Sequence, residues 1–153
     1  MSIHILERTQ LISAPITEVW AFFSTPENLD TLTPQNMGFK ILSPRPIPKA
    51  FEGQLIEYKV RPVLNMPLYW KTKITSVIEG DSFVDEQLKG PYSLWRHTHQ
   101  FIEQGNQVLM KDRIEYKLPF GLLGDVVNKL YVKNRLKDIF DFRYKKTEEL
   151  FSK

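Results

Sequence analysis

The middle of the chain is a succession of alternating segments separated only by short turns. The alternating segments lie at about residues 53–62, 68–79, 82–89, 93–103 and 107–118. The later ones are separated by the turn signals Glu79-Gly80-Asp81, Gly90-Pro91 and Gly105-Asn106. Strands joined by such short turns pair antiparallel, because a parallel crossover needs about a dozen residues or more. This feature predicts an antiparallel meander rather than βαβ units.

A long helical pattern follows the last of these strands. It begins after Pro119 and continues almost to the end of the chain, over about 28 residues, which at about 1.5 Å per residue makes roughly 40 Å. A helix of that length can cross the whole sheet. One side of it is expected to carry Leu123, Val126, Val127, Leu130 and Asn134.

The N-terminal part of the chain predicts one strand and two short helices. Residues 3–12 alternate as a strand, with His4 on the parity that we expect to be exposed. Proline-initiated helical patterns follow at 15–24 and 26–33. A weak strand and a proline-rich connection then occupy 39–48.

Alternation along each strand divides its side chains between two faces. In residues 107–118 one parity is entirely charged over four positions, so that face is expected to meet water and the other to point inward. Asp85 and Gln87 belong to the inner face if Phe83 points inward. The inner face is then expected to hold Tyr58, Trp70, Thr72, Asp85, Gln87, Trp95, His97, His99, Phe101, Asp112 and Tyr116.

The polar residues of this inner face need partners, because an isolated buried charge is costly. Four interpretations stay open. His97, His99 and Asp112 could form a satisfied internal network, or a polar floor that hydrogen-bonds the headgroup of a ligand. They could also act as a carboxylate-oriented general base, with Tyr58 or Tyr116 donating to an enolate oxygen. A metal site has plausible ligand types but no further support, so no metal is expected.

Several local motifs resemble a known superfamily. They are Phe83-Val84-Asp85-Glu86-Gln87, Gly90-Pro91-Tyr92, Trp95-Arg96-His97-Thr98-His99-Gln100-Phe101 and the stretch from Met110 to Gly121. With the order of elements, they resemble the helix-grip (SRPBCC) superfamily of START lipid-transfer domains, birch-pollen-type allergens and aromatic polyketide cyclases. They are similar to its bacterial branch, which is described as polyketide cyclase/dehydrase-like or ligand-binding.

The resemblance covers essentially the whole chain and implies a fold. It implies one α+β helix-grip domain over residues 1–153, with a curved antiparallel sheet of about six to seven strands wrapped around the long C-terminal helix. Two short helices would lie between strands 1 and 2. The resemblance also implies an internal cavity for apolar or amphipathic small molecules, without a cofactor, but it implies no reaction.

Composition narrows the remaining classes of function. The chain has no cysteine, which excludes disulfides, thiolate metal sites and cysteine nucleophiles, and a cytoplasmic location is expected. The net charge is only +3, and nothing indicates nucleic-acid binding or stable membrane insertion. Much of the positive charge lies in the last helix, where a solvated face is expected to carry Lys129, Lys133, Arg135, Lys137, Arg143, Lys145 and Lys146; a patch for nucleic acid or an anionic membrane is the alternative.

These observations favour a protein that binds a hydrophobic or amphipathic small molecule of lipid, polyketide or aromatic type. Leu130 and Asn134 of the helix are expected to join the inner-face residues around that ligand. The alternatives are an aromatase/cyclase or dehydratase that uses His97 or His99 with Asp112, and a non-catalytic regulatory interaction module. The last ranks lowest, because the outward faces of the strands are mostly charged. The oligomeric state stays open.

Overall fold

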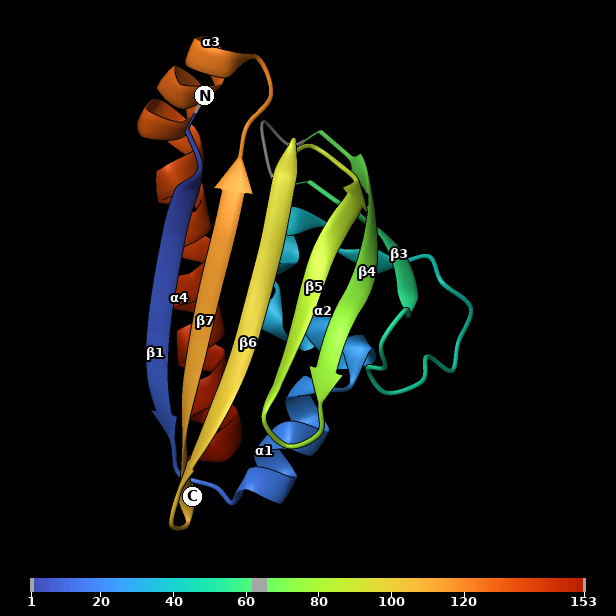
Figure 1. Cartoon of the computed structure of the whole chain (residues 1–153), viewed down its shortest axis with the longest axis vertical. Helices are drawn as coiled ribbons and strands as arrows, with labels where there is room; N and C mark the ends of the chain where they lie inside the picture. Colours follow the sequence, from blue (N-terminus) through green and yellow to red (C-terminus); the bar gives the residue numbers. More distant parts are fainter. Residues whose placement is uncertain (1, 62–65, 153) are drawn as a thin grey trace.

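The computed structural model describes residues 2–61 and 66–152, and this part of the chain contains one curved, seven-stranded antiparallel sheet (Figure 1). The strand order is β1-β7-β6-β5-β4-β3-β2. The strands are β1 (His4–Ile12), β2 (Lys40–Ile41), β3 (Leu55–Val60), β4 (Leu68–Ile78), β5 (Ser82–Lys89), β6 (Leu94–Gln104) and β7 (Gln107–Lys117). Of the weak strand expected over 39–48, only β2 forms. The predicted antiparallel meander is confirmed.

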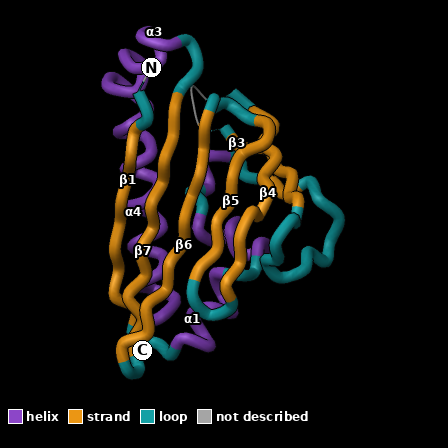
Figure 2. Tube along the Cα trace, viewed as in Figure 1, coloured by secondary structure: helices purple, strands orange, loops and turns teal. Residues whose placement is uncertain are grey.

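Helices cover one face of this sheet (Figure 2). Between β1 and β2 lie α1 (Ile16–Phe23) and α2 (Leu29–Leu32), with short 3₁₀ turns before and after α2. The C-terminal helix comprises α3 (Gly121–Val127), a π-helical turn (Asn128–Val132) and α4 (Lys133–Phe151). This arrangement is the helix-grip fold, so the expected fold class is confirmed. None of the described helices has the length and apolar content needed to cross a lipid bilayer.

Hairpin turns fix the register of β5, β6 and β7, the three strands that carry the polar inner-face residues. Gly80 and Gly105 occupy the β4–β5 and β6–β7 turns with φ of 74° and 64°, a conformation that glycine adopts without steric cost. The long β6–β7 ladder sets His99 opposite Asp112, and the β5–β6 ladder sets Asp85 opposite His97. Four ionisable side chains from three adjacent strands are thereby brought to one place.

The C-terminal helix presents a different side to the sheet from the one predicted. Its inward positions are Gly124, Asn128, Val132, Leu136, Phe140, Arg143, Thr147 and Phe151, which recur at three- and four-residue steps. Leu130 and Asn134 are exposed. Two close contacts set this rotation: Gly124 packs so tightly on Pro119 that a Cβ would lie 2.2 Å from the Pro119 carbonyl oxygen, and the Tyr116 hydroxyl donates to Asn128 Oδ1 at 2.7 Å.

The first strand also corrects an expectation. His4 is half-buried rather than exposed: its Nε2 lies 3.2 Å from Asp125 Oδ1, and its ring contacts that of Tyr116. Its neighbours Ile3 and Ile5 are exposed instead. β1 is an edge strand that pairs only with β7, and His4, Arg8 and Gln10, which share one side of it, all contact the C-terminal helix.

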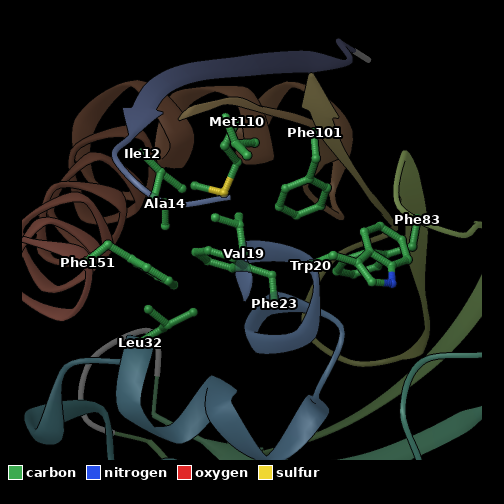
Figure 3. Packing of buried hydrophobic residues seen from close by; sticks show 11 residues of the cluster. Ile12, Ala14, Val19, Trp20, Phe23, Leu32, Phe83, Phe101, Met110 and Phe151 are labelled. Atoms are coloured by element: carbon green, nitrogen blue, oxygen red, sulfur yellow. The ribbon is translucent and has the colours of Figure 1, made fainter. Parts of the chain in front are cut away.

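Buried apolar residues form two clusters along the inside of the sheet. The packed core contains Ile12, Ala14, Val19, Trp20, Phe23, Leu32, Phe83, Phe101, Val108, Met110 and Phe151, and Figure 3 shows side chains from β1, α1, α2, the sheet and α4 converging there. The cavity cluster contains Met37, Val60, Trp70, Tyr92, Ile114, Tyr116, Val132, Leu136 and Phe140. Only the second contains tyrosines.

Candidate ligand cavity

A cavity of about 180 Å³ lies between the sheet, the short helices and α4. Its wall is mostly apolar and aromatic, with side chains from five strands, both short helices and α4. Residues that form it include Phe23, Leu29, Met37, Phe39, Ile41, Ile56, Tyr58, Val60, Trp70, Ile74, Tyr92, Trp95, Leu136 and Phe140. Ligand sites of this kind are concave and apolar with a few placed polar groups.

The carboxylates, imidazoles and guanidinium at the cavity form one polar cluster, which comprises Asp85, His97, His99, Asp112 and Arg143. Asp85, His97, His99 and Arg143 line the cavity, and Asp112 lies behind the histidines. His97 Nε2 is 2.7 Å from Asp112 Oδ1, and His99 Nε2 is 2.6 Å from Asp85 Oδ2. Each histidine therefore has its own carboxylate.

The hydrogen bonds of the polar cluster run diagonally across the strands. Residues directly opposite in the ladders are farther apart, with His99 Nδ1 at 3.5 Å from Asp112 Oδ1 and His97 Nδ1 at 4.0 Å from Asp85 Oδ2. The two imidazole rings stack with centroids 3.6 Å apart, and Phe83 stacks on the other side of His99 at 4.0 Å. Stacking and diagonal bonding together hold both rings in fixed orientations.

The protonation states follow from burial and from this pairing. Burial would raise the pKa of Asp85 and of Asp112, but hydrogen bonds from the paired histidines and the charge of Arg143 outweigh it and lower both pKa values. Burial, reinforced by His97, lowers the pKa of His99 to about 4 against the pull of Asp85. At neutral pH the cluster therefore holds two carboxylates beside a neutral His99.

Arg143 is the member of the polar cluster that was not predicted from the sequence. It was expected on a solvated basic face, yet it is 9% exposed and lines the cavity. Its guanidinium lies 5.4 Å from the Phe140 ring centroid, and among the described residues it makes no hydrogen bond or ion pair. Its spacing from Leu136, Phe140 and Thr147 on the inward side of α4 is the signal that could have identified it.

Two further polar atoms are buried without a hydrogen-bond partner in the described structure: Trp70 Nε1 and His99 Nδ1. Because Nε2 of His99 donates to an ionised Asp85, Nδ1 of the neutral ring is an acceptor. Trp70 Nε1 is a donor only. Both residues line the cavity, so a donor, an acceptor and the Arg143 guanidinium remain around it without full pairing.

Tyr58 adds a neutral hydroxyl to the cavity wall. Burial, helped by the negative charge of Asp85, raises the pKa of Tyr58 far above its usual range. Its hydroxyl lies 3.0 Å from Thr72 Oγ1, and either oxygen could be the donor. The pair supplies a hydroxyl that can both donate and accept.

The structure brings most of the predicted inner-face residues to the cavity. Those that line it are Tyr58, Trp70, Thr72, Asp85, Trp95, His97 and His99. Phe83 does point inward, as the placement of Asp85 required, and Asp112 joins the cluster from behind.

Besides Asp112, five predicted residues do not line the cavity. Gln87 uses its amide to hold the β5–β6 turn, bonding the backbone N–H and carbonyl of Tyr92. Phe101 belongs to the packed core, and the Tyr116 hydroxyl is bonded to Asn128. Leu130 and Asn134 are corrected to surface positions, because the helix turns its other side to the sheet.

A metal could in principle be held by Asp85, His97 and His99, whose ligand atoms lie within 4.8 Å of one another. Both Nε2 atoms are already bonded to carboxylates, and the positive Arg143 acts on the same carboxylates. Both features oppose a second cation at this place. The geometry therefore supports a hydrogen-bonding site better than a metal centre.

Comparison with known proteins identifies the fold. No protein-family model matches the sequence, and no curated protein matches it either. Among solved structures, a START superfamily protein from Mycobacterium smegmatis aligns at 13% identity over 96% of this chain and 99% of its own, with a TM-score of 0.70. Major latex-like protein 151 from Panax ginseng aligns at 13% identity over 99% of both chains, also with a TM-score of 0.70.

An enzyme shares the fold as well. Norcoclaurine synthase from Thalictrum flavum, in complex with dopamine and hydroxybenzaldehyde, aligns at 18% identity over 99% of this chain and 90% of its own, with a TM-score of 0.66. Identities this low show a common fold and leave the chemistry to the residues of each protein.

Proposed function

We propose that this protein binds a hydrophobic or amphipathic small molecule of lipid, polyketide or aromatic type in the cavity between the sheet and α4. The observation that carries the proposal is the buried Arg143 guanidinium, which lines the mostly apolar cavity and acts on Asp85 and Asp112 through its charge, yet makes no direct ion pair or hydrogen bond among the described residues. Burying a charge without a direct hydrogen-bond partner is costly. A ligand that accepts hydrogen bonds from the guanidinium would offset this cost.

The unpaired groups define the polar end of such a ligand. Arg143 and Trp70 Nε1 donate hydrogen bonds, and His99 Nδ1 accepts one. A hydroxyl or carbonyl group suits them: its oxygen can take the donors, and a hydroxyl can also donate to His99. The apolar remainder of the ligand would pack among Tyr58, Trp95 and the aliphatic wall.

The fold agrees with this proposal. START and latex-like proteins share it, and the norcoclaurine synthase structure holds two small aromatic molecules. A cytoplasmic setting, expected from the cysteine-free sequence, belongs to the same proposal.

The test is native mass spectrometry of the protein purified from its own host, followed by organic extraction of any bound molecule. We expect a stoichiometric small molecule with an apolar body and a hydroxyl or carbonyl group. Arg143→Met should weaken its binding at least about 10-fold, since hydrogen bonds to charged groups contribute about 1.5–3 kcal/mol. Lys145→Met removes an exposed positive charge from the same helix and serves as the matched control.

Two outcomes would contradict the proposal. One is a protein that emerges empty and binds no member of a panel of fatty acids, sterols, polyketides and aromatic phenols. The other is equal ligand binding by the Arg143→Met and Lys145→Met variants, which would mean that the polar cluster does not contact the ligand.

Catalysis is a second candidate, favoured by the neutral state of His99. A lowered pKa keeps its ring unprotonated at neutral pH, and Asp85 orients it, which are two features of a general base. The pair expected from the sequence was a histidine with Asp112, and the structure gives that carboxylate to His97. An aromatase/cyclase or dehydratase reaction would need no cofactor. Turnover of a poly-β-ketone analogue, lost in His99→Gln, would support it; no turnover across a broad panel would rule it out.

A further inference from the structure

The helix side that was expected to face inward forms an exposed apolar surface at one end of the molecule. This apolar cap consists of Phe120, Leu122, Leu123, Val126, Val127, Leu130 and Tyr131. The most exposed are Phe120 at 81%, Leu122 at 79% and Leu130 at 73%. Single exposed apolar residues are normal on soluble proteins, but six along one short stretch of helix, with Phe120 directly before it, mark an interaction site.

Backbone conformation supports the same interpretation. Phe120 has φ 70°, a left-handed conformation that a bulky residue rarely adopts, and it precedes Gly121 with φ 53°. The strained residue is also the most exposed aromatic ring in the described chain. Strain and exposure at the same position indicate a functional role, because neither stabilises the folded protein by itself.

The charge around the apolar cap is positive. Residues 117–137 contain five basic side chains and only one acidic one, Asp125. Asp125 is bonded to Ser2 and His4. Lys129 and Lys133 are exposed on the helix that carries the cap. An apolar surface bordered by lysines complements an anionic lipid membrane, where lysines contact headgroups and apolar side chains enter the acyl boundary.

We propose that the apolar cap docks the protein on the surface of an anionic membrane, lying in the interface without crossing it. Figure 1 shows α3 at the end of the molecule, beyond the end of β7, where it can meet a flat surface without obstruction by the sheet. A second copy is a poorer occupant, because a symmetric contact through the cap would bring the same lysines of both chains together. A folded protein partner would need a groove to receive these protruding side chains.

The experiment is cosedimentation of the full chain with vesicles of phosphatidylcholine alone and of phosphatidylcholine mixed with phosphatidylglycerol. We expect binding to the mixed vesicles that weakens as salt is added. The double variant Leu122→Ser, Leu123→Ser should lower the partition coefficient at least about 10-fold, because two apolar side chains no longer enter the lipid. The matched control is Ile78→Ser with Leu150→Ser, two exposed apolar residues toward the opposite end of the molecule.

The proposal would be overturned by equal binding of the wild type and the Leu122, Leu123 variant, or by partition into anionic vesicles no greater than into neutral ones. It would also be overturned by a dimer in sedimentation analysis that the same variant dissociates, since the cap would then be a contact between copies. Circular dichroism of each variant establishes that it is folded. The inference does not depend on a ligand in the cavity.

Discussion

The packed core and the cavity cluster bury comparable tryptophans in opposite ways. In the packed core, Trp20 donates its Nε1 hydrogen to Glu79 at 2.8 Å and meets Phe83 and Phe101 edge to face. In the cavity cluster, Trp70 is just as buried, yet its Nε1 has no partner among the described residues. The packed core therefore satisfies its indole internally, whereas the cavity cluster leaves a buried donor that a ligand could satisfy under the proposed function.

Ring chemistry explains how the two regions differ in packing. The phenylalanines of the packed core fill space without polar atoms, so that Phe23 contacts both Phe101 and Phe151. The cavity cluster has one phenylalanine, Phe140, and otherwise uses tyrosine and tryptophan, with Trp70 contacting Tyr92 and Trp95 at 5.6 and 5.2 Å. Amphipathic rings bring hydroxyl and N–H groups that require partners, and this favours an interior that keeps room for a ligand.

Truncating one phenylalanine in each region should give the largest difference. Phe101→Ala should lower the free energy of unfolding by about 3–5 kcal/mol, because it opens a void inside a close-packed cluster. Phe39→Ala should lower it by less than about 2 kcal/mol, because Phe39 is only half-buried and already borders the cavity. Chemical denaturation of both variants measures the two losses. Equal losses would mean that the two regions are packed alike.

Acid should destabilise the protein mainly through the cavity side, where three ionisable groups with lowered pKa values lie. The pKa of His99 falls from an ordinary value of 6.5 to about 4 in the native state. Between about pH 7 and 4 the unfolded chain therefore takes up a proton that the native protein excludes, and the free energy of unfolding decreases by up to about 3 kcal/mol. Below this range Asp85 and Asp112, whose pKa values are lowered, add a further loss because the unfolded chain protonates them first.

Denaturant midpoints measured across this range test the assignment. His99→Gln should flatten the dependence between about pH 7 and 4 while leaving the acid loss due to the carboxylates. An unchanged slope in this variant would assign the titration to another group. His4→Gln is a suitable control, because His4 lies outside the cavity at the edge of the sheet.

The strands were predictable from the sequence because period-two alternation and glycine turns are local signals. The same alternation placed His97, His99 and Asp112 on one inner face, which the β6–β7 register brings together. It could not say that the hydrogen bonds run diagonally, since that depends on side-chain rotamers and not on strand parity.

The C-terminal helix shows where prediction from the sequence failed. The apolar stripe containing Leu130 looked like a buried face, and Arg143 looked like part of a solvated one. The structure reverses both, because the contacts of Gly124 and Asn128 with β7 and the segment after it fix the rotation of the helix. The spacing of apolar residues along the helix does not reveal these contacts, because each one joins the helix to a residue outside it. A hydrophobic stripe on a helix does not by itself indicate burial in the core, because a surface that contacts a membrane or a partner has the same pattern.

The smallest changes in the free energy of unfolding are expected from enlarging a side chain. One alanine in each region allows the same substitution to be compared. Ala14 lies in the packed core at 3% exposure, and Ala50 borders the cavity. Ala14→Leu should lower the free energy of unfolding by about 1–3 kcal/mol, since a filled core must shift to accept three more carbons. Ala50→Leu should change it by less than about 1 kcal/mol, because its side chain can extend into about 180 Å³ of open volume. If the proposed ligand occupies that volume, the added carbons compete with it, so Ala50→Leu should also weaken its binding. If Ala50→Leu instead destabilised the protein as much as Ala14→Leu does, the cavity would have no spare room, and the distinction between the two regions would fail.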